Sequence, residues 1–339
     1  MIDPVSGFPY PEAWVAKCDE PAALKLAESG FGVLTANGTV LRRGFTTGTT
    51  AAAAAFAAVA SLRGESITEA EITLPCGVTA NVPTKGRNGC GEARKFAGDY
   101  PDDITAGILI CAEAKPADAT TLIAGEGIGR FSRSTPRYAE GEPAISPQAR
   151  DEILSAIESG CRAAGIAAAE VLLTIPDGRR IGALTLNPKV GVLDGISVVG
   201  TTGFVEPWDD HLTETLAERI SAAERVVITT GRTGLRFSRL LFPEYEVVLA
   251  GSKISEALAA AEGCQNAVIC GLPGLILRFF DSKTATSRGF ATVEELMASS
   301  AGSVALSAEV ADAKVRYPHL RIVIIDRAGT VLIDSEEES

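Results

Sequence analysis

The order of apolar and polar residues predicts a mixed sheet and two long helices in the first half of the chain. Five consecutive alanines, Ala51 to Ala55, predict a helix over residues 50–63 with a threonine N-cap at Thr49 or Thr50. Residues 147–165 have the spacing of an amphipathic helix that a glycine closes. Strands are predicted over residues 71–75, 79–83, 92–96, 107–112 and 121–124. This pattern is typical of an antiparallel or mixed sheet packed on a helix.

Shorter elements surround that sheet. Residues 1–40 are predicted to be a lead-in with two short helices and a hairpin that turns at Asn37-Gly38. A second hairpin is predicted to pair residues 171–175 with residues 181–185, across Pro176-Asp177-Gly178. A buried strand over residues 195–199 is expected to lead into a turn at residues 200–203.

The pattern changes near residue 211. Three short apolar strands, over residues 226–231, 246–251 and 267–271, each end at a glycine and are separated by helix-length spacers. Helices are expected at 212–223, 253–262 and within 292–316, followed by a hairpin of 321–326 with 330–334, and the tail 336–338 is expected to be disordered. The fold class predicted is therefore an α+β N-terminal domain over 41–210, followed by a smaller α/β domain with a parallel sheet over 211–335.

Composition and charge restrict the class of protein. The 339 residues are 46% hydrophobic, contain no run of about 18 apolar residues, and begin without a signal-peptide pattern, so a soluble cytoplasmic protein is expected. The formal charge of 31 − 43 = −12 argues against a nucleic-acid or anionic-membrane partner, and any polyanionic substrate must meet a local cluster of arginine or lysine. Seven scattered cysteines without a C-x-x-C pair, and only two histidines, predict no metal site.

Candidate chemistry begins at Arg42-Arg43-Gly44-Phe45-Thr46-Thr47-Gly48, directly before the alanine run. The N-terminus of a helix offers unpaired N–H groups and the positive end of the dipole, which suits an anionic or polar ligand, but the same pattern also describes a simple capped helix. A second Thr-Thr-Gly stands at residues 201–203, and Thr230-Gly231-Arg232-Thr233-Gly234 follows a predicted parallel strand, at the edge where such sheets bind ligands. The loop over 125–130, G-x-G-x-G-R, resembles a nucleotide fingerprint without its helix.

Several of these patches, taken in order, resemble one known family. They are Leu41 to Thr49, Lys95 with Ala97-Gly98-Asp99, Gly125 to Arg130, Gly141 to Ile145, Asn187 to Gly191, Gly195 to Gly203, and Gly231 to Gly234. This ordered set resembles the cobalt-precorrin-5B (C1)-methyltransferase (CbiD) family of anaerobic cobalamin biosynthesis. The resemblance implies transfer of a methyl group from S-adenosylmethionine to C1 of cobalt-precorrin-5B, which gives cobalt-precorrin-6A, with the cobalt-corrin precursor as the small-molecule partner and no protein-bound metal. The resemblance does not decide whether the chain forms a homo-oligomer.

The resemblance also suggests roles for residues in the matched patches. The candidate proton acceptors are Asp99, which lies in a loop of acids, Glu126 and Glu206. The candidates for holding the substrate carboxylates are Arg42, Arg43, Arg130, Lys189 and Arg232. The glycine and threonine turns are the candidates for the methyl donor, namely Thr46, Thr47, Gly48, Thr49, Gly200, Thr201, Thr202, Gly203, Gly231 and Gly234.

The chain departs from the family pattern in its C-terminal part. The resemblance implies a Gly-His-x-Gly-Lys turn and a later Thr-His-Ser, where this chain has residues 271–275 (Gly-Leu-Pro-Gly-Leu) and 285–287 (Ala-Thr-Ser). Two alternatives therefore stay open. One is a divergent protein that binds a corrinoid precursor without catalysis, and the other is a nucleotide- or phosphate-using enzyme built on the 125–130 loop.

Overall fold

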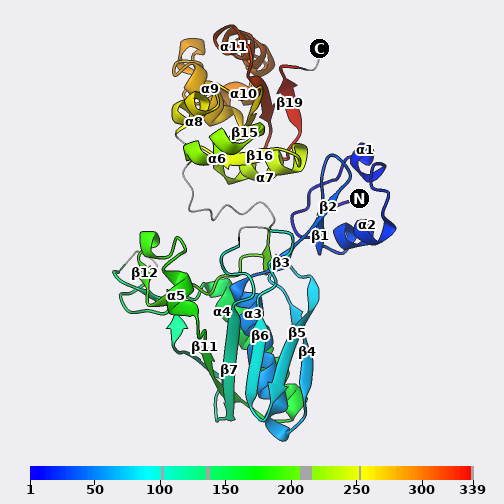
Figure 1. The fold of residues 1–339 in the computed structure, drawn as a ribbon, viewed down its shortest axis with the longest axis vertical. Coiled ribbons are helices and arrows are strands. Elements are labelled where there is room, and N and C mark those ends of the chain that lie inside the picture. The colour runs from blue at the N-terminus through cyan, green and yellow to red at the C-terminus, as the bar shows by residue number, and fades with distance from the viewer. Residues whose placement is uncertain (101–102, 135–137, 207–215, 252, 337–339) are drawn as a thin grey trace. The chain divides into compact units, whose positions relative to one another are not determined.

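The structure is a computed structural model that describes residues 1–100, 103–134, 138–206, 216–251 and 253–336, without the side chains of Lys189 and Glu218. The described chain forms two compact units (Figure 1). The first unit holds residues 1–9, 20–33 and 40–206, and the second holds residues 10–19, 34–39 and 216–336. Residues 1–40, predicted as a lead-in, contribute to both units. The boundary predicted near residue 210 and the end of the tail lie outside the described residues.

The first unit is built on a six-stranded sheet with the strand order β4-β5-β6-β7-β11-β8. Its neighbours are antiparallel except β11 and β8, which run parallel, so the predicted mixed sheet is confirmed. The strands are β4 (Ile67–Thr73), β5 (Thr79–Arg87), β6 (Cys90–Arg94), β7 (Leu109–Pro116), β8 (Thr121–Ala124) and β11 (Ala169–Thr174).

The alanine-rich helix α3 (Thr47–Ala60) lies between this sheet and α4 (Pro147–Ala164) (Figure 1). A helix that is apolar all round is a buried helix, and thirteen of its fourteen residues are buried. Close approach of the two layers depends on glycine: a Cβ at Gly91 would stand 2.1 Å from the Ala54 carbonyl oxygen, and one at Gly86 would stand 2.4 Å from the Ala57 oxygen. The small alanine side chains of α3 and the glycines of β5 and β6 therefore let the helix pack closely against the sheet.

Three predicted details of this unit are wrong. The N-cap of α3 is Thr46, three residues before the first predicted position. Residues 181–185 form no strand, because β11 already pairs with β7 on one edge and β8 on the other, and the chain forms α5 (Gly178–Gly182) instead. The strand predicted over 195–199 is only β13 (Gly195–Ile196).

Short elements make up residues 1–42 and the remainder of the first unit. Helices α1 (Glu12–Val15) and α2 (Pro21–Glu28) and the paired strands β1 (Gly32–Leu34) and β2 (Val40–Arg42) match the sequence prediction for residues 1–40. Three two-stranded pairs stand beside the main sheet: β3 (Gly44–Phe45) with β14 (Phe204–Val205), β9 (Gly127–Ile128) with β13, and β10 (Arg130–Phe131) with β12 (Val192–Leu193). Two 3₁₀ turns are η1 (Ser61–Arg63) and η2 (Pro188–Val190).

The second unit has a five-stranded sheet with the order β16-β15-β17-β18-β19, parallel except for β19. The first strand along the chain, β15, lies inside the sheet. It pairs in parallel with β16 on one edge and with β17 on the other, which confirms the predicted parallel βα pattern. The strands are β15 (Arg225–Thr230), β16 (Glu246–Leu249), β17 (Asn266–Gly271), β18 (Arg321–Ile325) and β19 (Val331–Asp334). The helices are α6 (Leu216–Ala222), α7 (Gly231–Leu241), α8 (Ile254–Ala260), α9 (Pro273–Phe280), α10 (Val293–Ala298) and α11 (Gly302–Arg316), with the turn η3 (Thr286–Arg288).

Each unit has its own apolar core. Within the described ranges, no helix combines the length and the apolar character that crossing a bilayer requires.

Candidate functional site

The two Thr-Thr-Gly turns pack against each other in the first unit. The antiparallel pairing of β3 with β14 brings the start of α3 to the 200–203 turn. The Thr46 N–H donates to the Gly203 carbonyl at 3.0 Å, and the Gly48 N–H donates to the Val199 carbonyl at 2.9 Å. The Thr47 hydroxyl accepts a hydrogen bond from the Val199 N–H at 2.9 Å. The structure therefore brings together two motifs that are far apart in sequence.

This packing uses the first polar groups of α3 inside the protein. The Thr46 hydroxyl caps the helix by accepting from the Thr49 N–H at 3.2 Å, and residues 46–50 are all buried. In the facing turn Gly200 and Gly203 are buried, Thr202 is half-buried and Thr201 is exposed. A ligand at this end of α3 would have to displace the 200–203 turn, because that turn covers the helix start.

A buried glutamate that the sequence analysis did not single out lies behind the same turns. Glu152 on α4 is only 5% exposed, and its Oε2 has no hydrogen-bond partner among the described residues. A Cβ at Gly200 would stand 3.3 Å from this oxygen. Burial raises the pKa of Glu152 to about 7, although a hydrogen bond with Thr49 acts in the opposite direction. The glutamate could have been found from its helical spacing, since it falls on the buried stripe of α4 with Ala149, Ile153, Ala156 and Ile157.

The hydrogen bonds around Thr49 indicate which protonation state of Glu152 fits the fold. The Thr49 Oγ1 lies 2.8 Å from Glu152 Oε1 and 2.9 Å from the Gly203 carbonyl oxygen. A hydroxyl has one hydrogen and donates to only one of these oxygens. A protonated Glu152 donates to Thr49, which is then free to donate to Gly203, so the neutral acid satisfies both contacts. An ionised Glu152 takes the Thr49 hydrogen and leaves Gly203 with one bond fewer.

Arg43 lies in the interior of the first unit, with 2% of its surface exposed. Its guanidinium donates to both carboxylate oxygens of Asp3 at 2.9 and 2.7 Å, and its Nε donates to Glu206 at 2.8 Å. Burial lowers the pKa of Arg43, but the two carboxylates outweigh this effect and hold it above its ordinary value. This geometry indicates a structural role for Arg43 and Glu206. Substrate binding by Arg43 and proton acceptance by Glu206 stay predictions.

Arg42 and Asp99 form a second, more exposed pair. The Arg42 Nη2 and Nε donate to Asp99 Oδ1 at 2.7 and 2.9 Å, and the Arg42 backbone N–H donates to Asp99 Oδ2 at 2.8 Å. Burial raises the pKa of Asp99, but the hydrogen bonds from Arg42 more than offset it and hold the pKa below its ordinary value. Asp99 is therefore an ionised partner of Arg42 at neutral pH. In the same acid loop, Lys95 and Asp103 form a buried ion pair.

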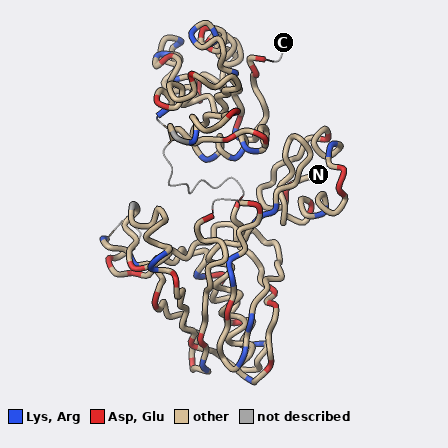
Figure 2. Tube along the Cα trace, in the orientation of Figure 1, with Lys and Arg blue, Asp and Glu red and all other residues tan. Residues whose placement is uncertain are grey.

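Glu126 and Arg130 lie in the G-x-G-x-G-R loop, which forms β9 and β10. Both side chains are exposed, and the Arg130 guanidinium donates to the backbone carbonyls of Gly141 and Ala124. The loop runs into β10, and the next helix in the described chain, α4, begins only at Pro147. The hypothesis of a nucleotide fingerprint therefore lacks a helix N-terminus at the loop that would bind phosphate. The side chain of Lys189 lies outside the description. Figure 2 shows acidic and basic residues spread over both units. A cluster of cations that meets a polyanionic substrate would therefore occupy a small part of the surface.

The remaining predicted residues lie in the second unit. Gly231 begins α7 at the carboxyl end of β15, with φ +69° and no atom within 4 Å of the position that a Cβ would take, and together with Thr230 it borders a cavity of 1080 Å³. This crevice lies at the carboxyl ends of β15 and β17, on either side of the point where the strand order reverses. Gly234 instead packs on the sheet, since a Cβ there would stand 2.5 Å from Thr229 Oγ1. Arg232 is exposed.

Comparison with known proteins finds relatives that match this chain over nearly its full length. The model of the CbiD family matches residues 34–207. A protein of Methanoregula boonei is 52% identical over 337 residues, which are 99% of this chain and 100% of that protein. A protein of Methanospirillum hungatei is 48% identical over 99% of this chain and 100% of its own length. Both are named cobalt-precorrin-5B C(1)-methyltransferase.

A solved structure gives the same answer. The crystal structure of the cobalamin biosynthesis protein CbiD from Archaeoglobus fulgidus is similar to this chain with a TM-score of 0.56 and 34% sequence identity. The likeness covers 96% of this chain and 100% of that one. From the matched family region, the full-length relatives and this structure together, the chain belongs to the CbiD family.

Proposed function

We propose that the protein is a cobalt-precorrin-5B (C1)-methyltransferase of anaerobic cobalamin biosynthesis, which takes its methyl group from S-adenosylmethionine and gives cobalt-precorrin-6A. The observation that carries this proposal is the identity of about half of all residues with proteins of that name over 99% of the chain. The first unit supports it as well, because the motifs of the resemblance at 41–49 and 195–203 meet at the start of α3.

The crevice of the second unit has the properties that a methyl donor requires. S-adenosylmethionine supplies an electrophilic methyl group on a sulfonium, and its adenosyl part needs an apolar cleft with a few polar groups. The crevice offers apolar walls, among them Leu272 and Met297, and its lining also includes the polar residues Thr230 and Asp326. The open space beside Gly231 gives a ligand room next to the backbone.

The turns of the first unit fit the donor less well. Their hydroxyls and N–H groups at Thr46, Gly48 and Thr49 are bonded within the protein, whereas the crevice at Gly231 is open. We therefore place the donor at Thr230 and Gly231, and give the Thr-Thr-Gly turns the role of holding β3, α3 and β14 in register.

Binding of S-adenosylhomocysteine, measured by isothermal titration calorimetry, tests this placement. Gly274 borders the crevice and has no atom within 4 Å of its Cβ position, so Gly274→Phe adds a bulky side chain at the crevice without a clash at its Cβ. Gly263 has the same free surroundings elsewhere in the second unit, which makes Gly263→Phe a matched control. We expect Gly274→Phe to weaken binding at least about tenfold and the control to leave it unchanged. Equal affinity in both variants would place the donor elsewhere.

Methyl transfer itself is tested with the full chain in a single turnover. Methyl-labelled S-adenosylmethionine is mixed with enzymatically prepared cobalt-precorrin-5B, and label in the corrinoid is measured for the wild type, Thr47→Val and Asp99→Asn. We expect label in the corrinoid with the wild type and slower transfer with both variants, because Thr47 bonds to Val199 and Asp99 fixes Arg42. Most of the rate is expected to come from positioning the two reactants.

One observation favours a second candidate, a protein that binds the corrinoid precursor without catalysis. The segments in which this chain departs from the family pattern both border the crevice, through Leu272, Pro273, Gly274, Leu275, Ala285 and Thr286. Corrinoid binding with no transfer of label would favour this candidate over the enzyme.

A further inference from the structure

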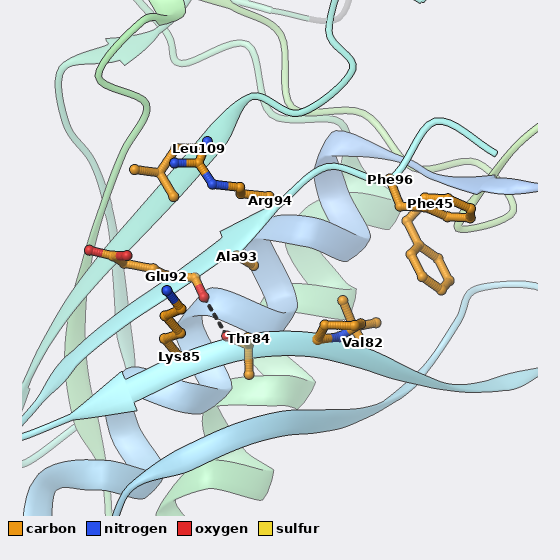
Figure 3. A pocket seen from close by; sticks show the side chains of 10 residues that line it. Phe45, Val82, Thr84, Lys85, Glu92, Ala93, Arg94, Phe96 and Leu109 are labelled. Carbon is orange, nitrogen blue, oxygen red and sulfur yellow. Dashed lines mark hydrogen bonds between the residues drawn. The ribbon is translucent and has the colours of Figure 1, made fainter. Parts of the chain in front are cut away.

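The main sheet of the first unit has a hollow where two neighbouring strands part. β5 and β6 pair from Arg87↔Cys90 only as far as Thr84↔Ala93. The next residue of β5 is Pro83, which has no N–H to donate to a ladder. Beyond it the strands diverge, and the gap forms an open cavity of about 530 Å³ (Figure 3). This volume lies in the range of small-molecule sites.

The walls of the hollow are apolar and aromatic. Val82, Pro83, Ala93 and Leu109 line it along the strands, and Phe45 and Phe96 close one end with ring centroids 6.3 Å apart (Figure 3). Phe96 is 44% exposed, which is unusual for an aromatic side chain that serves only the core. The cavity also touches the motif region directly, since Phe45 is the residue before the N-cap of α3.

Two cations and one anion stand among the lining residues. Lys85 and Arg94 contribute positive charge, against Glu92. The Arg94 Nη1 donates to the Gly107 carbonyl at 3.1 Å. Lys85 lies directly opposite Glu92 in the pairing of β5 with β6, and it makes no hydrogen bond or ion pair with a described residue. Arg42 lies over the Phe96 ring at 5.7 Å from its centroid, with its charge paired by Asp99. The hollow therefore carries an excess of one positive charge in a protein of net charge −12, with two cationic side chains among its lining residues that are able to meet carboxylates.

We propose that this hollow takes one edge of the corrin macrocycle, with ring carboxylates at Lys85 and Arg94 and the apolar face of the ring against Phe45 and Phe96. The inference rests on the proposed function, because it assigns the acceptor of that reaction to a place. A flat apolar ring with several carboxylates fits a site that combines aromatic walls with cations at its rim, where each carboxylate gains a charge-assisted hydrogen bond.

The test compares two cobalt corrins that share the macrocycle and differ in whether their carboxylates are free or methylated. Cobyrinic acid carries free carboxylates, and its heptamethyl ester carries none; equilibrium dialysis read by corrin absorbance gives the affinity of each. Lys85→Gln and Arg94→Gln are measured beside Arg87→Gln, a control two residues along the same strand and outside the hollow. We expect each of the first two variants to weaken binding of the acid about tenfold, the control to change it less than about twofold, and the ester to bind the wild type more weakly than the acid.

Other outcomes would overturn the inference. Unchanged affinity in Lys85→Gln and Arg94→Gln, or equal binding of acid and ester, would show that the hollow does not hold the carboxylates. Sedimentation in which the wild type is a dimer and these variants are monomers would assign this face to a second copy of the chain instead. Labelled methyl transfer by the wild type is measured in parallel. If the methyl group is transferred but the variants bind the corrin as the wild type does, only the proposed binding place is refuted. If the variants weaken binding but no methyl group is transferred, only the proposed enzymatic activity is refuted.

Discussion

Replacing the buried Glu152 with glutamine should change how the stability of the first unit depends on pH. Glu152→Gln keeps the shape of the side chain and removes its titration. In the wild type, burial holds the pKa of this acid at about 7, against an ordinary value of 4.5. One pKa unit corresponds to about 1.4 kcal/mol, so the full effect is about 3 kcal/mol.

The sign follows from the two protonation equilibria. Below pH 4.5 the acid is protonated in both the folded and the unfolded state, so its raised pKa does not change the free energy of unfolding. Between 4.5 and about 7 the unfolded chain releases the proton while the folded protein keeps it, so the wild type loses stability as the pH rises. Above that range the loss is complete. Relative to the variant, we expect the wild type to lose about 2.5 kcal/mol of unfolding free energy between pH 5 and pH 8.

Urea-dependent hydrogen exchange gives the stability of this unit alone. Peptides that cover α3 and α4 report its unfolding, so the second unit does not contribute to the measurement. Because other carboxylates titrate over the same range, the quantity to follow is the difference between wild type and variant. Glu158→Gln, at an exposed position on the same helix, is the control, and its difference in stability from the wild type should be the same at pH 5 and pH 8. If the difference in unfolding free energy between the wild type and Glu152→Gln stays constant from pH 5 to pH 8, the conclusion that burial keeps Glu152 neutral is wrong.

Three further substitutions test the packing of the first unit, each by the same exchange measurement. Thr46→Ala removes the N-cap of α3 and should cost about 1 kcal/mol, while an unchanged stability would assign the cap elsewhere. Gly91→Ala should cost more than the cap does, about 2–3 kcal/mol, because its Cβ would stand 2.1 Å from the Ala54 oxygen; a smaller loss would mean that the helix shifts away easily. Asp3→Asn leaves the Arg43 guanidinium buried without one of its charge partners and should cost about 3–5 kcal/mol, and a neutral result would contradict the structural role of Arg43.

Local patterns predicted the secondary structure well where one residue type dominated. The alanine run indicated α3 because alanine has the highest helix propensity, and the strands that end at glycine indicated the parallel sheet of the second unit. The cap of α3 was misplaced because several threonines near the helix start are able to serve. Contacts with Val199 and Gly203, more than 150 residues later, select Thr46. The false strand at 181–185 has a similar cause, since only the sheet order shows that both edges of β11 are taken.

The candidate site was predictable only in part for the same reason. Sequence alone indicated the Thr-Thr-Gly turns and the pair formed by Arg42 and Asp99 as separate candidates, and the fold brings the members of each together. Asp3 was missed because it stands in an N-terminal segment without a motif, and its partner Arg43 is 40 positions away. Glu152 was missed because its helix was interpreted only as amphipathic, although an acid on the apolar stripe of α4 was visible.

The burial of α3 on every side has a consequence for synthesis of the chain. This helix has no polar face to expose to water, and its long sides are covered by strands and a helix that follow it in sequence, the last of them being β11, which ends at Thr174. While the chain leaves the ribosome, α3 therefore emerges more than 100 residues ahead of its last cover. The nascent chain must carry an alanine-rich apolar segment in the open for that time, and at a typical rate of about 5–20 residues per second this lasts roughly 5–25 seconds. Alanine suits this interval, since it offers helix propensity with the least apolar surface for wrong partners to bind.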